Sequence, residues 1–406
     1  MTMDALRAQL ETLPAGAFKS FHDWVFQDTA PGTLGPWLKA NGWLQLERLA
    51  GHLFSGLVEE RELGTVLARL EPLHAYAVYV TAADVLEDVP RHHPLEPRAR
   101  EVIHGFNAAM GLALQGEHAR GVARLHALAE VCATLPAFTW RLFPSEHLEL
   151  ARRWATGGLE ALERESVLMS LWMQLLAAER LVGQARGTPL APLVEEGVRA
   201  RYQAVDTLLG APPEEPSALL EAATWSVLVS PSLAVYLLAL RHLRPELRLE
   251  AEAWRAPLYD AAVQVRLLND YGPLILLEEE RLPLLDRALA EAPPGTLGET
   301  LRTGLPAWAG LLTRVRRDLG LGESSLAHQG LEERPVGQAR EPFMQRLRFF
   351  GRAWRQAARR MNETLDALAA ASGQPEPGTL VRRFVGFHAA LYARTADRGQ
   401  GDYRVE

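Results

Sequence analysis

Apolar residues recur every three to four positions along nearly the whole chain, and this period limits the fold more than any other feature. In residues 165–186 the apolar side chains follow the i, i+3, i+4, i+7 spacing of one buried helix face. No sustained alternation of apolar and polar residues accompanies this pattern, as strands would require. The sequence therefore predicts an all-α fold. Further helical stripes run through 44–70, 73–88, 98–114, 118–134, 217–243, 254–280, 299–318, 343–371 and 378–395.

Proline and glycine mark where the stripes are interrupted. The segments 89–97 and 210–217 predict breaks between helices, because each is rich in proline. The segment 291–299 predicts a turn, with the next helix beginning near Thr296 or Gly298.

The helices line up as one continuous array. We therefore expect residues 1–406 to form a single large helical domain, with residues 1–40 as its N-terminal segment. Residues 319–342 are polar and glycine-rich, which predicts a mobile loop or a lid.

Composition excludes several classes of protein. The chain has 43 basic and 50 acidic residues, a net charge of −7, which argues against a broad nucleic-acid-binding surface. The single cysteine, Cys132, excludes an internal disulfide framework and a cysteine-based metal site. Asp4 and Glu11 stand where a signal peptide needs an apolar core, and no apolar run reaches the ~18 residues of a membrane span. We therefore expect a cytoplasmic protein.

An acidic cluster ends one predicted helix. The sequence YVTAADVLEDVP delivers Asp84, Glu87 and Asp88 to one face at the C-terminal end of that helix. Negative charge is unfavourable there because the helix dipole adds to it, so a divalent cation would stabilise the cluster. The plain alternative is a solvated helix end whose carboxylates pair with an arginine such as Arg91 or Arg98.

A second feature lies in residues 217–280, where a helix interrupted around WSVLVSPS precedes a helix ending in RLLNDYG. Together with the acidic cluster, this region resembles the class I terpene synthase family. In that family a DDxxD or DDxxE motif and a downstream NDxx[ST]xxxE motif bind three Mg²⁺ ions, which hold the diphosphate of a linear isoprenoid. The order of acidic motif, interrupted helix and Asn-Asp helix is the same here. Residues 35–53 and the C-terminal segment from Val381 to Glu406 are also similar to the family's two ends.

The resemblance implies two sets of Mg²⁺ ligands, which are Asp84, Glu87 and Asp88 in the first set and Asn269, Asp270 and Glu278 in the second. Ala83 replaces the first Asp of the family motif, Pro273 its hydroxyl residue and Leu277 its last Glu. If the helix continues past Pro273, Asp270 and Glu278 share a face, and a kink there would move Glu278 toward the expected position. Asp84 and Asp88 alternatively match the DxxxD of squalene and phytoene synthases.

The resemblance also implies how a substrate is held. A diphosphate suits the guanidinium fork, and a carbocation needs an apolar cavity with aromatic faces. The arginines expected on the diphosphate are Arg266, Arg398 and Arg404, with Tyr403 closing over it and Arg382 and Arg383 as further candidates. The expected lining residues are Tyr76, Phe106, Trp225 and Tyr236, with Ser226 and Ser230 at the helix interruption.

The expected function is Mg²⁺-dependent ionisation and cyclisation of farnesyl or geranylgeranyl diphosphate, by a protein for which a homodimer is the default. The departures from the motifs leave a catalytically decayed, prenyl-lipid-binding helical protein as one alternative, and a head-to-head condensing enzyme as another. A ferritin-like di-iron oxidase is a third, because Glu-x-x-His occurs twice, at Glu71…His74 and Glu101…His104.

Overall fold

The computed structural model describes residues 3–27, 32–89, 93–138, 145–154, 158–210, 212–277, 279–322 and 325–393. These residues form helices joined by turns, with two isolated β-bridges and no β-strand among them, so the predicted all-α fold is confirmed. The chain divides into two compact units. Among the described residues, unit 1 comprises those up to Asp206 together with Ala234–Leu247, and unit 2 comprises those of Thr207–Leu233 and those from Arg248 onward. The expectation of a single domain stays a prediction.

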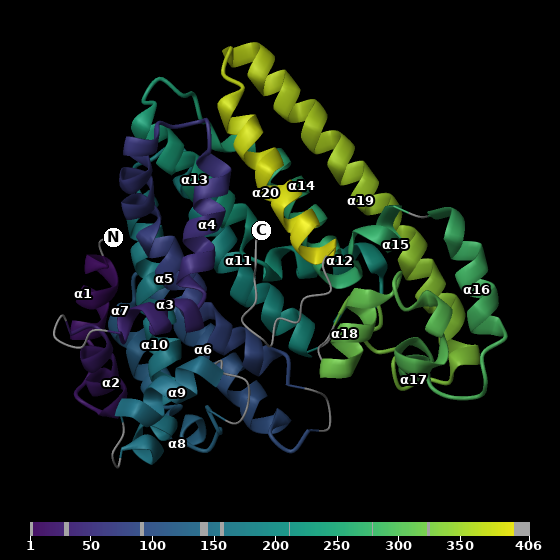
Figure 1. The fold of residues 1–406 in the computed structure, drawn as a ribbon, viewed down its shortest axis with the longest axis horizontal. Helices are drawn as coiled ribbons and strands as arrows, with labels where there is room; N and C mark the ends of the chain where they lie inside the picture. The colour runs from purple at the N-terminus through teal and green to yellow at the C-terminus, as the bar shows by residue number, and fades with distance from the viewer. Residues whose placement is uncertain are drawn as a thin grey trace. The chain divides into compact units, whose positions relative to one another are not determined.

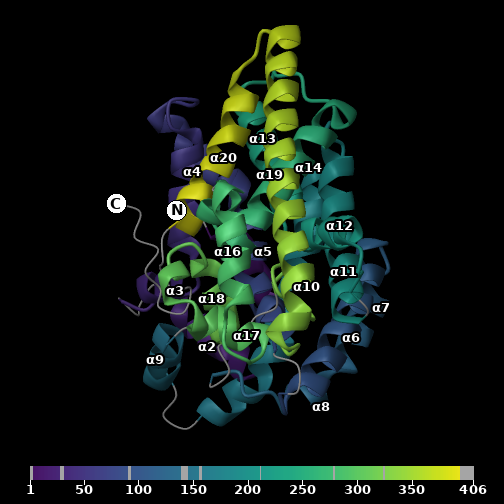
Figure 2. The same ribbon diagram turned by 90° about the vertical axis from the view of Figure 1, so that its right-hand side faces the viewer.

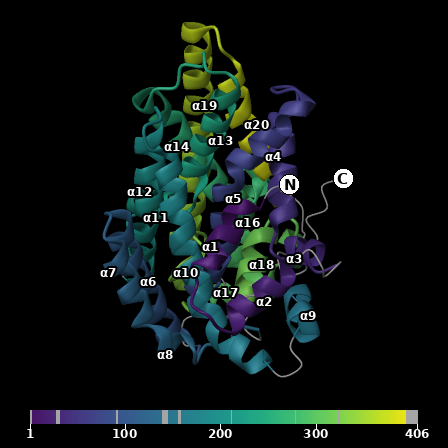
Figure 3. The ribbon, with the colours of Figure 1, turned by 90° about the vertical axis from the view of Figure 1, so that its left-hand side faces the viewer.

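Unit 1 is built around the pair α5 and α10, which pack along each other with α1, α2 and α6 beside them. Figure 3 shows α6 and α7 lying side by side in this unit. Its helices are α1 (Asp4–Glu11), α2 (Ala17–Val25), α3 (Leu34–Ala40), α4 (Trp43–Phe54), η1 (Glu60–Glu62), α5 (Leu63–Glu87), α6 (Glu96–Leu114), α7 (His118–His126), α8 (Ala129–Cys132), α9 (Ser145–Trp154), α10 (Leu159–Ala185) and most of α11 (Ala191–Gly210).

Unit 2 is built around α14, against which α19 and α20 pack (Figure 1). The length of α19 beside α14 is also visible in Figure 2. Its helices are α12 (Pro216–Ser226), the start of α13 (Val229–Leu243), α14 (Ala251–Tyr271), α15 (Pro273–Leu277), η2 (Glu279–Arg281), α16 (Leu282–Ala290), α17 (Leu297–Glu299), η3 (Thr300–Gly304), η4 (Pro306–Trp308), α18 (Thr313–Leu321), α19 (Val336–Ser372) and α20 (Glu376–Ala393).

Several predicted breaks are confirmed. Helix α5 ends at Glu87 and α6 begins at Glu96, while α11 ends at Gly210 and α12 begins at Pro216. Thr296 caps α17 through a capping box with Glu299, in which each side chain accepts the other residue's main-chain N–H. The predicted interruption around WSVLVSPS is also present, because α12 and α13 are bent by 43° at Val227–Leu228.

Helix α5 differs from the prediction, since it runs continuously through Pro72 where the sequence showed two stripes. Proline inside a helix removes one main-chain hydrogen bond and costs about 3 kcal/mol. Pro72 and its neighbours Leu70 and Leu73 are buried, so the packing of this stretch offsets the cost.

The segment 319–342 contains the end of α18, turns at 325–334 and the start of α19. Leu326, Ala327 and Leu331 are buried in the core of unit 2. Whether this segment moves stays a prediction.

No single described helix is long and apolar enough to cross a membrane, and only the bent pair α12 and α13 meets that test when the two are taken together.

Candidate functional site

The acidic cluster lies at the end of α5, as predicted, and its partner is Arg201 of α11. The Arg201 guanidinium donates from Nη2 to Asp84 Oδ1 and, over 3.1 Å, to Glu87 Oε1. Its side chain is 5% exposed, against 15% for Glu87 and 46% for Asp84. Burial lowers the pKa of Arg201, but the charges of Glu87 and Asp84 outweigh it and raise that pKa above its ordinary value. Arg201 is therefore a fixed positive charge that neutralises this helix end.

A buried tyrosine pair lies next to this ion pair. Tyr76 of α5 and Tyr202 of α11 share a hydrogen bond of 2.5 Å between their hydroxyls, and the Gln174 amide donates to Tyr202 over 3.0 Å. Phe106 lies edge-on to Tyr202, with ring centroids 5.8 Å apart. Burial raises the pKa of Tyr76 to about 12, so both hydroxyls stay protonated at neutral pH. Tyr76 and Phe106 thus belong to one network, although each is fully buried in the core.

Asp270 lies at the end of α14, where it is almost completely buried. Its side chain is 2% exposed, and its Oδ2 accepts from Arg266 Nε over 3.0 Å and from the Leu326 main-chain N–H over 3.3 Å. Burial raises the pKa of the Asp270 carboxyl, while the charge of Arg266 and the Leu326 N–H lower it. Asp270 therefore connects α14 to the 325–334 turns.

Asn269 is held by a second arginine, Arg314 of α18. Arg314 donates from Nε to the Asn269 main-chain oxygen over 2.7 Å and from Nη2 to its side-chain oxygen over 2.9 Å. The same guanidinium lies over the Tyr392 ring, 5.0 Å from its centroid. The side-chain oxygen that the resemblance assigns to Mg²⁺ thus accepts from a guanidinium here.

Helix α14 ends at Tyr271, so the continuous helix on which a shared face of Asp270 and Glu278 depends is absent. Gly272 follows with φ +75° and ψ 161°, a conformation that is essentially restricted to glycine, and Pro273 then begins the separate helix α15. Proline suits that first helical position because its missing N–H has no intrahelical partner there. Glu278 lies outside the described residues.

The other predicted substrate residues are dispersed. In unit 2, Trp225 packs against Tyr259, the Ser226 hydroxyl donates to the Ala223 main-chain oxygen over 2.9 Å, and Ser230 is buried at the start of α13. Tyr236 belongs to unit 1 and packs beside Phe54. Arg398, Tyr403 and Arg404 lie outside the described residues, while Arg382 pairs with Asp366 and donates to Asn362.

The two sets of predicted ligands differ in whether they can bind a divalent cation. Asp84 also accepts from an arginine, through Oδ1, but it is half-exposed, so a cation could reach it with substrate oxygens and water as the other ligands. Asn269 and Asp270 do not fit one in this conformation, because their side-chain oxygens accept from arginines and from a main-chain N–H. Among the described residues no group of three His, Cys, Asp or Glu side chains is placed to hold a metal.

The two Glu-x-x-His pairs of the di-iron alternative do not converge in the described part of the chain. The Glu71 carboxylate accepts from the Leu6 main-chain N–H over 3.1 Å, while His74 packs edge-on against Trp43. His104 lies 3.4 Å from Asp206 and is largely exposed. These contacts give the His residues ordinary structural roles.

Two arginines that organise the clusters, Arg201 and Arg314, were not identified from the sequence. Arg201 does carry a signal, because it follows Val194 and Val198 at helical spacing on the buried face of α11. A charged residue at a core position indicates a buried partner. Arg314 carries no comparable signal, since its partner lies 45 residues away in the chain.

Comparison with known proteins finds no match: no family model, no curated protein and no solved structure matches this chain. The resemblance to class I terpene synthases therefore rests on the residues themselves.

Proposed function

We propose that this protein acts on a linear prenyl diphosphate in a Mg²⁺-dependent reaction of the class I terpene synthase type. The observation that supports the proposal most is where the helices end. Asp84 and Glu87 lie at the end of α5, Asn269 and Asp270 lie at the end of α14, and the chain breaks between α12 and α13. The order of these features is the order in the family that the sequence resembles.

The chemistry requires positive charge at the leaving group. Ionisation of an allylic diphosphate separates a carbocation from diphosphate, and fixed cations stabilise the charge that develops. Mg²⁺, when bound at Asp84, supplies part of that charge, because Mg²⁺ takes one or two carboxylates together with substrate phosphates.

The chain's own residues give the Asp84 end its electrostatics. Arg201 satisfies Glu87 and one oxygen of Asp84, so a cation there meets a cluster that is already partly neutralised. Mg²⁺ would compete with Arg201 for Asp84, and substrate phosphates would supply its remaining ligands.

A second candidate is a prenyl-lipid-binding protein without catalysis, and the arrangement at α14 favours it. Arg314 and Arg266 hold Asn269 and Asp270, and Gly272 ends the helix before Pro273. In this candidate a guanidinium group neutralises the Asp270 carboxylate, as Mg²⁺ would in the first candidate.

The experiment that tests the proposal is incubation of the purified chain with geranyl, farnesyl and geranylgeranyl diphosphate. Each substrate is tested with and without Mg²⁺, and products are identified by gas chromatography–mass spectrometry. A Mg²⁺-dependent hydrocarbon or alcohol from one substrate supports the proposal and identifies the chain length. Folded protein that binds a prenyl diphosphate without converting it supports the second candidate, and absence of both binding and turnover contradicts both.

A further inference from the structure

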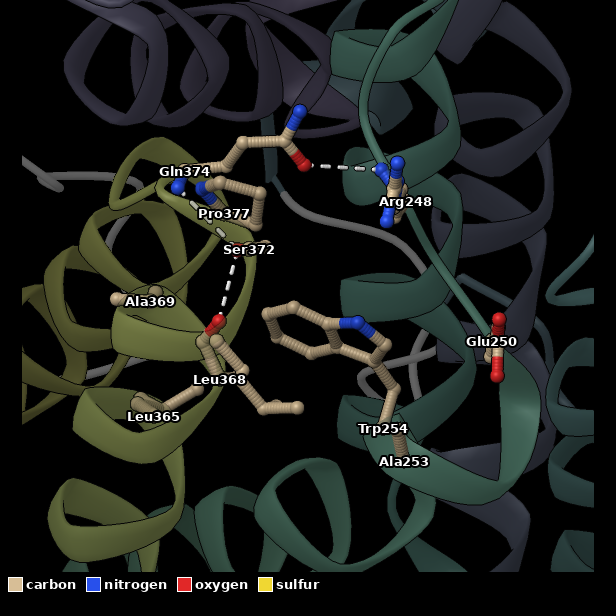
Figure 4. A pocket seen from close by; sticks show the side chains of 12 residues that line it. Arg248, Glu250, Ala253, Trp254, Leu365, Leu368, Ala369, Ser372, Gln374 and Pro377 are labelled. Atoms are coloured by element: carbon tan, nitrogen blue, oxygen red, sulfur yellow. Dashed lines mark hydrogen bonds between the residues drawn. The ribbon is translucent and has the colours of Figure 1, made fainter.

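Unit 2 contains a cavity of about 180 Å³ that is separate from both acidic clusters. It lies between the start of α14, the C-terminal part of α19 and the start of α20, and is partly open to solvent (Figure 4). An apolar protein cavity of about 150 Å³ holds one benzene molecule. This cavity is therefore large enough for one six-membered ring with a small substituent.

Part of the cavity wall is apolar and buried. Trp254 is 4% exposed and Leu365 is 1% exposed, and Leu368 completes the surface on the α19 side. An aromatic ring against an indole gains from its favourable offset or edge-on geometry as well as from burial. The walls thus suit a planar apolar group.

Hydrogen bonds hold the two sides of the opening together. The Gln374 side-chain oxygen accepts from the Arg248 main-chain N–H over 3.0 Å, and the Gln374 main-chain N–H donates to the Ser372 hydroxyl over 3.2 Å. Both bonds are drawn in Figure 4. The first bond joins the segment before α14 to the turn after α19, and the second orders that turn.

Two donors at the cavity, from Arg248 and Trp254, lack an acceptor in the described part of the chain. The described residues provide no ion pair or hydrogen-bond acceptor for the Arg248 guanidinium, which is exposed at the rim, and none for the Trp254 indole N–H. The indole nitrogen lies on the edge of its ring nearer to Arg248 (Figure 4). Both groups are donors only, so a ligand complementary to them carries an acceptor, best a carboxylate.

We propose that this cavity binds a small monocyclic aromatic carboxylate. The ring lies between Trp254 and the leucines of α19, and the carboxylate accepts from Arg248 and from the indole N–H. Glu250 also lines the cavity and repels a second negative charge, so the ligand is a monocarboxylate.

The probe for this proposal is phenylacetate, with its neutral isostere phenylacetamide as the comparison. Binding to the full-length protein is measured by saturation-transfer NMR and isothermal titration calorimetry at low salt. A Kd for phenylacetate on the order of 1 mM is expected for a ligand of this size. Arg248→Gln weakens phenylacetate binding about tenfold and leaves phenylacetamide within about twofold. Arg255→Gln is the matched control, because Arg255 is on α14, pairs with Glu252 and does not line the cavity.

A second variant tests the cavity itself and leaves the charge of Arg248 unchanged. Ala369→Leu fills the space from α19 with a good helix former and abolishes binding of both compounds, while thermal unfolding reports that the fold is retained. The proposal is overturned if neither compound binds the natural chain at about 20 mM. It is also overturned if Arg248→Gln weakens both compounds equally or neither, or if binding survives in Ala369→Leu.

Discussion

Arg314 binds Asn269 at two points, through the main-chain oxygen at 2.7 Å and the side-chain oxygen at 2.9 Å. Arg314 is 5% exposed, and its contacts include these two acceptors and the face of Tyr392. The residue that most resembles a metal ligand on α14 therefore has a structural role in this conformation.

The first prediction concerns this pair. Asn269→Leu removes one side-chain acceptor of the buried Arg314 and lowers the free energy of unfolding by about 1–3 kcal/mol. Asn269→Asp keeps an acceptor there and changes it by less than about 1 kcal/mol. Urea unfolding followed by circular dichroism measures both, and equal losses in the two variants would contradict the role given to the Arg314 contact.

The second prediction concerns Arg201. Arg201→Met removes the counter-charge of Glu87 and lowers the free energy of unfolding by about 3–5 kcal/mol. Arg199→Met is the matched control on α11, because Arg199 makes only a half-exposed i, i+4 pair with Glu195, and costs less than about 0.5 kcal/mol.

The same variant reports on metal binding at the end of α5. If Asp84 and Glu87 take a cation once Arg201 is gone, Mg²⁺ raises the Tm of Arg201→Met by about 3 °C or more and that of Arg199→Met by much less. An equal response of the two variants to Mg²⁺ would exclude a cation at this helix end.

The third prediction concerns the helix end at Gly272. Gly272→Ala forces a side chain into φ +75° with its Cβ 3.1 Å from Arg314 Cγ, and costs about 1–3 kcal/mol. Gly320→Ala is the control, because no atom lies within 4 Å of its added Cβ, and at this exposed position of α18 it raises stability by about 0.5–1 kcal/mol. We expect thermal unfolding to give a lower Tm for Gly272→Ala and a higher Tm for Gly320→Ala.

The fourth prediction concerns pH. Burial lowers the pKa of His328 from 6.5 to about 4, with a further contribution from the charge of Arg346, and neither ring nitrogen has a hydrogen-bond partner among the described residues. The unfolded chain therefore takes up this proton at higher pH than the fold does, and stability falls as pH drops from about 6.5 to about 4.

His328→Leu removes this contribution and leaves stability at pH 7 unchanged or higher. The natural chain then loses about 3 kcal/mol more than the variant between pH 7 and pH 4. Parallel stability curves for the two proteins over this range would show that His328 does not titrate in this way.

The helices were accessible from sequence because their causes are local. The stripe at 98–114, the proline-rich breaks and the helix start near Thr296 depend on residues within a few positions of each other, and the structure has all three. The continuous helix through Pro72 was not predicted. The free-energy cost of a proline inside a helix is offset there by packing, which the local sequence pattern does not show.

The candidate sites were accessible only in part, because their partners are distant in the chain. Asp84 and Asn269 lie at helix ends as expected, yet Arg201 is 117 residues from Asp84 and Arg314 is 45 residues from Asn269. No periodic pattern relates such residues. The ending of α14 at Gly272 depends on a backbone conformation that Pro273 alone did not specify, since proline also occurs inside α5.

The measurement that tests the central claim most directly is Mg²⁺-dependent release of diphosphate by Asp84→Asn and by the natural chain, with the substrate that gives turnover. Glu87 remains as a carboxylate partner of Arg201 in this variant, so the fold is retained, and the account predicts that turnover falls by orders of magnitude. Unchanged turnover in a folded Asp84→Asn protein would remove Asp84, and the metal at the end of α5, from the function proposed for this chain.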